Sequence, residues 1–266
     1  MKKRIILSII ALLSCLAIGF SVGFFWPHPA DTPDTQSVKM IAHRGWSSAE
    51  CENTAAAFIA ASNRSYYAIE CDVHLTKDGQ FVIIHDATTG AVCDTDLTVA
   101  DSTWADLSAL VLHDKNGIVR QDQRIPLLVD YLRICKTYGK VAEIELKAVF
   151  SREDIGRIVD LCRDTIGLEQ VMFVSFDINN LLYVREFTDA PAQYVCTAFY
   201  STDIRTVMQE KDIDLAVKET WLTKKEHLDE LHDWGFSVNA WTVNDPARAA
   251  QLAEWGVDFI TTDVLE

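Results

Sequence analysis

The sequence predicts an α/β fold, in which alternating strands and helices close into an irregular (β/α)8 barrel with a small insertion after the third strand. From Lys39 onward, short apolar runs alternate with amphipathic segments, an order typical of a mostly parallel sheet. Runs such as FVIIH (81–85) and VMFV (171–174) indicate strands buried on both faces. The 266 residues suffice for one large domain, because such barrels take about 250 residues.

Nine segments have the composition of strands, one more than a regular barrel needs. They are 39–43, 67–73, 81–86, 141–146, 171–176, 193–197, 212–217, 236–243 and 257–262. Only residues 74–80 separate the second segment from the third, which is too short for a crossover helix. We therefore expect one strand to be extra and the barrel to be irregular at that point.

Six segments are expected to be helices: 54–63, 127–138, 152–163, 179–187, 224–233 and 246–254. The last begins with Asp245 as a cap and Pro246 at the first helical position. Gly235 and Gly256 stand where two of these helices should end. Residues 94–124 show little periodicity and are interpreted as the insertion above the third strand.

Residues 1–26 are expected to anchor the protein in a membrane. Lys2, Lys3 and Arg4 precede an uncharged run over 5–26, which as a helix would extend about 33 Å, the thickness of a hydrocarbon core. The positive flank should stay in the cytoplasm, which places the barrel outside it. Residues 27–38 are interpreted as a polar linker and 39–266 as the barrel domain.

Two alternatives to the anchor remain open. A cleaved signal peptide would give a secreted protein, but the apolar run is longer than such peptides need. A lipoprotein signal ending at Cys15 in LLSC (12–15) is the other, although the residues after Cys15 stay apolar. We expect a single-pass protein of the cell membrane with an extracytoplasmic domain.

Charge and cysteine content exclude several classes of protein. The net charge is −15, from 39 acidic and 24 basic residues, so binding of nucleic acid is not expected. None of the seven cysteines forms a C-x-x-C pair, which argues against a zinc ribbon or a thioredoxin-like site. We predict buried free cysteines, with up to three disulfides in the main domain as the alternative.

Ionisable side chains gather at the ends of four predicted strands. They are His43 and Arg44 after the first, Glu70 and Asp72 on the second, His85 after the third, and Glu145 and Lys147 on the fourth. Barrel enzymes carry their reacting groups at the carboxyl ends of strands, so these side chains are expected to share one rim. Scattered ion pairs are the alternative, but they would rarely fall at four successive strand ends.

The carboxylates predict a metal site. Glu70 and Asp72 are two residues apart in one strand and therefore point to the same face. Together with Glu145 they would repel one another unless a cation lay between them. Oxygen ligands suit Ca²⁺ or Mg²⁺, whereas zinc is disfavoured because no cysteine is well placed.

Two histidines at this rim, His43 and His85, are candidates for acid–base chemistry, because their reference pKa is near 6.5. His74 has a weaker claim, since a turn is expected there. The other histidines are assigned no role: His28, His113, His227 and His232. Arg44 and Lys147, with a divalent cation, would make a local cationic pocket suited to a phosphodiester.

Several stretches together resemble the glycerophosphodiester phosphodiesterase family over nearly all of the chain from Lys39. They are HRGWSSAECENTAAAFIAA (43–61), IECDVHLTKDGQFVIIHD (69–86), IELK (144–147), SF (175–176) and WTVN (241–244). The resemblance implies a TIM-type barrel that hydrolyses glycerophosphodiesters to sn-glycerol 3-phosphate and an alcohol with a divalent cation. The substrate would be a small molecule or a lipid.

The resemblance also implies a role for each candidate residue. His43 and His85 match the acid–base histidines, and Glu70, Asp72 and Glu145 match the metal ligands. Arg44 and Lys147 match positions that contact phosphate. Trp241 matches an aromatic residue at the substrate pocket, and a place in the barrel core is an equal alternative. Other readings are a lysophospholipase D-like enzyme, an enzyme acting on envelope glycerophosphate polymers, and a non-catalytic membrane-tethered binding protein.

Some positions depart from the family pattern. Glu143 stands where a neutral residue is expected, so it should pair with a lysine or alter the metal preference. The usual glycine before Glu70 is missing from residues 64–67, and Val264 follows Asp263 where a proline is usual. No catalytic group is lost, so these differences bear on substrate preference.

Overall fold

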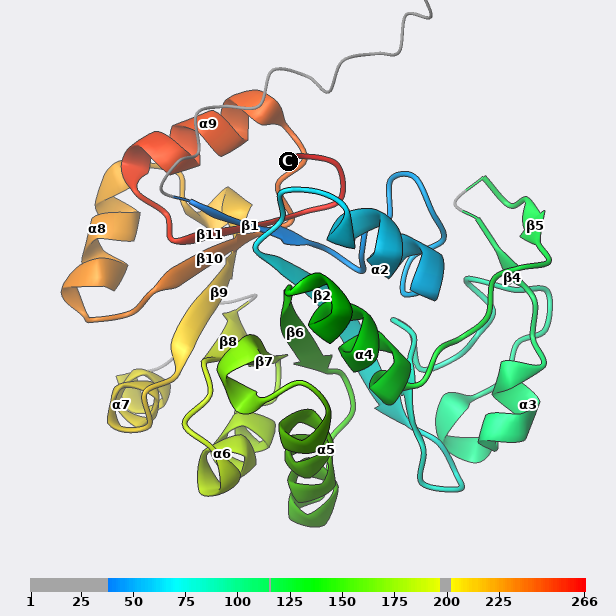
Figure 1. Ribbon diagram of the computed structural model, residues 1–266. Coiled ribbons are helices and arrows are strands. Elements are labelled where there is room, and N and C mark those ends of the chain that lie inside the picture. Colours follow the sequence, from blue (N-terminus) through cyan, green and yellow to red (C-terminus); the bar gives the residue numbers. More distant parts are fainter. Residues whose placement is uncertain (1–37, 115, 197–201) are drawn as a thin grey trace, which may run out of the picture. The chain divides into compact units, whose positions relative to one another are not determined.

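A computed structural model describes residues 38–114, 116–196 and 202–266, in which eight parallel strands close into a barrel (Figure 1). They are β1 (Lys39–Ala42), β2 (Ala68–Leu75), β6 (Val141–Leu146), β7 (Val171–Ser175), β8 (Ala192–Cys196), β9 (Asp214–Lys218), β10 (Val238–Trp241) and β11 (Phe259–Thr262). β1 pairs with β11 on one side and with β2 on the other, which closes the ring. The predicted barrel is confirmed.

Within the described residues, seven α-helices surround the barrel, apart from the short helix of the insertion (Figure 1). They are α2 (Ala55–Ser62), α4 (Leu128–Tyr138), α5 (Arg152–Thr165), α6 (Ile178–Phe187), α7 (Thr202–Glu210), α8 (Lys225–Asp233) and α9 (Pro246–Trp255), with short 3₁₀ helices η2 (Leu168–Gln170) and η3 (Glu219–Trp221). All six expected helices are among them, and α9 begins and ends at the predicted residues Asp245 and Gly256. Helix α7 was not predicted. Met208 is its one buried residue among those described, so its apolar stripe is short.

The extra strand is β3 (Phe81–Ile83), which is antiparallel to β2 and outside the barrel. Val73 lies opposite Ile83, so β3 pairs with the part of β2 that extends past the rim. The interpretation of 81–86 as a barrel strand with its carboxyl end at the rim was therefore wrong. His85 reaches the rim because the chain returns toward it alongside β2, after a turn too short for a helix.

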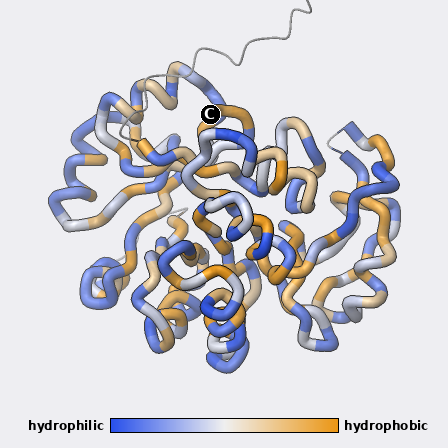
Figure 2. The backbone as a smooth tube through the Cα atoms, in the orientation of Figure 1, coloured by the Kyte–Doolittle hydropathy of each residue, from blue (hydrophilic) through white to orange (hydrophobic). Residues whose placement is uncertain are grey.

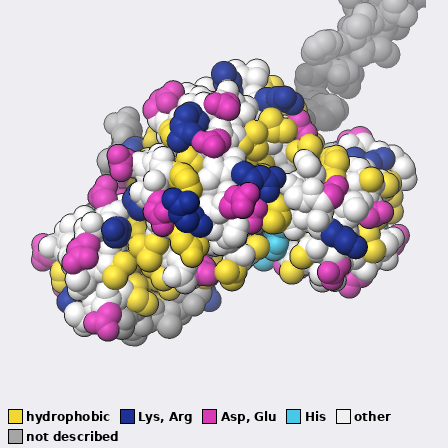
Figure 3. Space-filling view, turned by 90° about the horizontal axis from the view of Figure 1, so that it is seen from below, with side chains coloured by type: hydrophobic (Ala, Val, Ile, Leu, Met, Phe, Trp, Pro, Cys, Tyr) yellow, Lys and Arg dark blue, Asp and Glu magenta, His cyan; other side chains and the backbone are white. Residues whose placement is uncertain are grey.

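The predicted insertion is present and folds around apolar residues of its own. Between β3 and α4 it contains η1 (Val99–Asp101), α3 (Trp104–Ser108) and a hairpin of β4 (Leu112–His113) and β5 (Val119–Arg120). Leu107 and Leu112 of the insertion pack with Val82 and Ile84 from the β3 region. The insertion forms the lobe at the right of Figure 1, and Figure 3 shows a hollow between this lobe and the barrel.

The main core lies between the barrel and its helices. Hydrophobic residues follow the strands and the inward faces of the helices, whereas the outer turns are hydrophilic (Figure 2). Tyr131 of α4 and Phe58 of α2 are buried and meet edge to face, with 4.8 Å between ring centroids. Burying each such ring contributes about 1.5–3 kcal/mol, and this packing fixes α2 and α4 against β2.

The predictions for the cysteines and for the N-terminus have different outcomes. Six cysteines are described, and all are buried and free, as predicted. The expected anchor over 5–26 and the linker up to residue 37 lie outside the described residues. Among the residues that are described, no helix combines the length and the apolar character needed to cross a membrane.

Candidate active site

Three carboxylates meet at the carboxyl-terminal rim of the barrel. In the pairing of β2 with β6, Asp72 lies opposite Glu145, and Glu70 lies two pairs further in, opposite Glu143. One oxygen from each of Glu70, Asp72 and Glu145 lies within 4.8 Å of the others. Glu70 Oε1, Asp72 Oδ1 and Glu145 Oε1 are buried without a hydrogen bond, and Lys147 Nζ forms ion pairs with the last two. Such a set of oxygens fits a hard divalent cation, because a cation would supply the missing partner.

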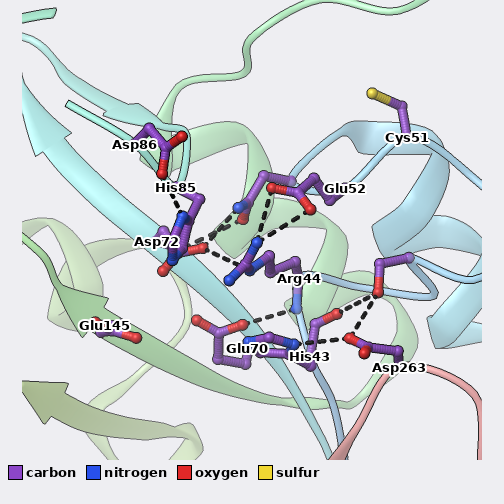
Figure 4. Close-up of polar contacts among 12 residues, drawn as sticks. His43, Arg44, Cys51, Glu52, Glu70, Asp72, His85, Asp86, Glu145 and Asp263 are labelled. Carbon is purple, nitrogen blue, oxygen red and sulfur yellow. Dashed lines mark hydrogen bonds and ion pairs between the residues drawn. The ribbon is translucent and has the colours of Figure 1, made fainter. Parts of the chain in front are cut away.

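Arg44 holds this cluster from the loop after β1 (Figure 4). Its backbone N–H donates to Glu70 Oε2 at 2.7 Å, and its Nη1 donates to both oxygens of Glu52 at 2.9 and 3.1 Å. Arg44 Nε lies 3.4 Å from Asp72 Oδ2, which also accepts from Asn53 Nδ2 at 2.7 Å. Arg44 is therefore fixed by carboxylates and also lines the rim cavity.

Lys147 connects the carboxylates to His85. Its Nζ lies 3.1 Å from Glu145 Oε1, 3.6 Å from Asp72 Oδ1 and 3.0 Å from His85 Nε2. The other ring nitrogen of His85, Nδ1, lies 2.7 Å from Asp86 Oδ1. Since an ionised carboxylate only accepts, His85 Nδ1 donates to Asp86, and Nε2 is left as an acceptor on the cavity side.

His43 has a similar arrangement on the opposite side of the cluster. Its Nδ1 lies 2.7 Å from Asp263 Oδ1, just after β11 (Figure 4). The pKa of Asp263 is about 2: burial raises it, but the bonds and charge of His43, Asn244 and Ser47 lower it by more. Asp263 was not identified from the sequence.

Burial and neighbouring charges shift the pKa values of the three clustered carboxyl groups in different directions. Burial raises the pKa of Glu70, and the charges of Asp72 and Glu145 raise it further. Burial and the charge of Asp72 raise the pKa of Glu145 to about 7. For Asp72, Arg44 and Lys147 outweigh burial and lower the pKa. Asp72 is thus the most stably ionised of the three.

A cavity at the rim has two unlike walls. The polar wall contains His43, Arg44, Glu70, His85, Glu145 and Lys147. The apolar wall contains Val174, Phe176, Val195, Ala216 and Trp241. The rings of Phe176 and Trp241 are nearly perpendicular, with centroids 5.7 Å apart. Trp241 therefore lines the cavity as well as packing in the barrel, and its Nε1 is a buried donor without a hydrogen bond.

Glu143 forms part of the cavity floor. It is 1 % exposed, and its Oε1 lies 3.4 Å from Asn239 Nδ2. Asn239 also bonds Gln193 and Thr261, so the barrel interior below the rim is polar. The expected pairing with a lysine is not seen among the described residues. Burial, with the charge of Glu145, raises the pKa of Glu143 to about 8.

The other histidines are placed largely as expected. His74 is buried, and its Nε2 contacts the backbone oxygen of His85 at 3.1 Å, so it supports the His85 loop without lining the rim cavity. His227 contacts a backbone oxygen, and His232 pairs with Asp258. His113 lines a second hollow that borders the site on the insertion side. His28 lies outside the described residues.

The sequence patterns missed the residues that hold the expected ones in place. These are Glu52 and Asn53 beside Arg44 and Asp72, and Ser47, Asn244 and Asp263 around His43. Glu52 and Asn53 lie within the stretch 43–61 that carried the resemblance, so their proximity to Arg44 was a usable signal. Asn244 ends the stretch WTVN (241–244), which also carried the resemblance, whereas Asp263 offered no such signal because it lies in a loop far along the chain.

Comparison with known proteins identifies the family of this chain. The profile of the glycerophosphoryl diester phosphodiesterase family matches residues 43–266. Bacillus subtilis YhdW, whose name places it among the glycerophosphodiester phosphodiesterases, is 32 % identical over 84 % of this chain and 93 % of its own. A lysophospholipase D of Mus musculus is 33 % identical over 84 % of this chain and 82 % of its own.

Solved structures share the fold. An Oleispira antarctica phosphodiesterase, determined in complex with the product sn-glycerol-3-phosphate, superposes with a TM-score of 0.78 at 24 % identity. The alignment covers 86 % of this chain and 94 % of that one. Because the family profile spans the barrel from His43 to the last residue, the chain belongs to the glycerophosphoryl diester phosphodiesterase family.

Proposed function

We propose that this protein hydrolyses glycerophosphodiesters to sn-glycerol 3-phosphate and an alcohol, with His43 and His85 as acid and base and a divalent cation held by Glu70, Asp72 and Glu145. The observation that carries the proposal is the cavity at the rim. Two histidines and two cationic side chains line this space together with Glu70 and Glu145, and Asp72 lies beside them in the carboxylate cluster.

The charges of the cavity suit an anionic diester in an acidic protein. Arg44 and Lys147 both line the cavity and would bind non-bridging phosphate oxygens. They would also stabilise the negative charge that develops on those oxygens during the reaction. A Ca²⁺ or Mg²⁺ ion bound by the three carboxylates would add Lewis-acid polarisation of the phosphate.

The two histidines would move the protons. Each has Nδ1 beside a carboxylate, Asp263 for His43 and Asp86 for His85, which leaves Nε2 as the acceptor of each ring. Nε2 of His85 also lies 3.0 Å from Lys147 Nζ, which would have to share it with the substrate. One histidine would take the proton of the attacking oxygen and the other would protonate the leaving alkoxide. The attacking group would be water or a hydroxyl of the glycerol, and the second route would pass through a cyclic phosphate.

The test is release of sn-glycerol 3-phosphate from glycerophosphocholine, measured with Ca²⁺, with Mg²⁺ and with a chelator. His43→Ala and His85→Ala should each lower kcat by about 100-fold or more. His232→Ala is the matched control, because His232 also pairs with an aspartate but lies away from the cavity. Near-wild-type hydrolysis by either rim variant with metal present would overturn the assigned roles.

A lysophospholipase D-like activity is the second candidate. The apolar wall of the cavity and the similarity to the mouse lysophospholipase D favour it. The two candidates are separated by comparing kcat/KM for glycerophosphocholine with kcat/KM for a lysophosphatidylcholine. Phe176→Ser should lower turnover of the lysolipid much more than turnover of the soluble diester if an acyl chain lies on this wall.

We also propose that residues 5–26 anchor the protein in the cell membrane, with the barrel domain outside the cytoplasm. The support is the uncharged run after Lys2, Lys3 and Arg4. An anchored protein should stay with membranes in alkaline carbonate, and external protease should reach its barrel domain. Recovery of a shortened, soluble protein from the medium would instead favour cleavage, and lipid labelling that depends on Cys15 would favour a lipoprotein.

A further inference from the structure

We propose that Asp263 is a positioning residue that holds His43 in one tautomer and one orientation for the reaction. This inference rests on the proposed function, in which His43 exchanges a proton with the substrate. Asp263 Oδ1 lies 2.7 Å from His43 Nδ1. Since a carboxylate only accepts, Nδ1 must carry the hydrogen, and the lone pair of Nε2 then faces the cavity that His43 lines.

Asp263 is itself fixed from two other loops. Ser47 Oγ donates to its Oδ1 at 3.1 Å, and Asn244 Nδ2 donates to its Oδ2 at 2.6 Å. The backbone N–H of Asp263 donates back to Asn244 Oδ1 at 2.9 Å. The loops after β1, β10 and β11 thus converge on one carboxylate. Both oxygens of Asp263 accept hydrogen bonds, which limits rotation of the carboxylate. The fixed carboxylate in turn sets the orientation of the His43 imidazole.

A purely structural ion pair is the competing explanation, because β1 and β11 are neighbours and the pair joins their ends. The chain contains a pair of that kind for comparison. His232 Nε2 lies 3.0 Å from Asp258 Oδ2, just before β11, where neither residue lines the rim cavity. Asp258 and Asp263 therefore form matched aspartate–histidine contacts, of which one faces the cavity.

The kinetic test uses the full-length protein in detergent, with glycerophosphocholine as substrate. Asp263→Asn should lower kcat at least about 10-fold with little change in KM, because an amide can offer N–H to Nδ1 and favour the wrong tautomer. Asp258→Asn should leave kcat within about two-fold of wild type. Thermal melts show whether each variant is folded at the assay temperature.

A double-mutant cycle separates positioning from structure. If Asp263 acts through His43, Asp263→Asn should cause no further loss in a His43→Ala background. The same fold-loss of kcat in both backgrounds would overturn the proposal, because the effect would then not pass through the imidazole.

An NMR measurement tests the proposal independently of activity. With ¹⁵N-labelled histidine, the signals of His43 are identified by their loss in His43→Gln. Wild-type His43 should be the Nδ1–H tautomer, and Asp263→Asn should shift it toward Nε2–H or a mixture. An Nε2–H tautomer in the wild type, or no change in the variant, would overturn the proposal. Absence of any diesterase activity would instead count against the proposed function.

Discussion

Asp72 and Glu145 face each other across two neighbouring strands, yet their charges are stabilised to different degrees. Asp72 is stabilised as an anion by a hydrogen bond from Asn53 and by the positive charges of Arg44 and Lys147. Glu145 has Lys147 as its cationic contact, and the negative charge of Asp72 repels its own. Two buried carboxylates at this distance need a further positive charge to be fully ionised together. At the scale of single residues, the carboxylate cluster is therefore suited to the proposed cation, which would balance its charge.

The Asp263 carboxylate should also make the fold sensitive to acid. Its folded-state pKa of about 2 lies below the ordinary value of 3.8, so its stabilising contribution is present above about pH 4 and is lost as the pH falls through 2. The difference corresponds to about 2 kcal/mol at neutral pH. Asp263→Asn should cost about that much at pH 7 and roughly half as much at pH 3. Urea denaturation of the wild type and of Asp263→Asn at pH 7 and pH 3 measures this loss of stability. A loss that is the same at both pH values would contradict the prediction.

Sequence reasoning found the residues that follow strands and missed those that orient them. Glu70, Asp72 and Glu145 could be grouped because residues two apart share a face and strands end at one rim. Asp263 lies 220 positions from His43, and no local pattern ties a carboxylate after the last strand to a histidine after the first. Contacts of this kind appear only once the barrel is closed.

At the scale of elements, β3 shows that hydrophobic periodicity and composition can predict a strand but not its direction or its place in the sheet. Its residues are as apolar as those of a barrel strand, and periodicity carries no information on strand direction. The short turn over 76–80 was the signal, and it correctly predicted an irregularity there. The antiparallel return then explains how His85 comes to face Lys147, just after β6, without a barrel strand of its own.

The turn between β1 and α2 packs so closely against α2 that a side chain at Gly45 should destabilise the fold. Gly45 has a φ of +75°, and a Cβ there would lie 2.7 Å from the backbone carbon of Ala57 in α2. Gly45→Ala should lower the free energy of unfolding by about 2 kcal/mol or more, because a left-handed residue gains a side chain that meets backbone. It should also lower activity, since Arg44 precedes it. Urea denaturation checks the first effect, with Gly139→Ala as control, because Gly139 is also left-handed but has open space.

At the scale of the whole molecule, an acidic protein places two cationic side chains in the candidate active site. The net charge of −15 would repel a phosphodiester, but Arg44 and Lys147 line the cavity and are held there by carboxylates. Binding of a cation by the same cavity would favour the folded state over the unfolded chain, since the ligands come from strands that are far apart in the sequence. Stability and substrate binding should therefore respond to the same ion.

Thermal unfolding should show this coupling. At a Ca²⁺ or Mg²⁺ concentration about 100-fold above Kd, the folded state gains about 2.7 kcal/mol, which for a domain of this size raises Tm by about 5–10 °C. Glu145→Gln should abolish most of this gain, because it removes one of the three ligands. Asp160→Asn is the control, since Asp160 is exposed on α5 and pairs with Arg163. Calorimetry with cation and with chelator measures both, and an equal cation-dependent rise in Glu145→Gln would place the ion elsewhere.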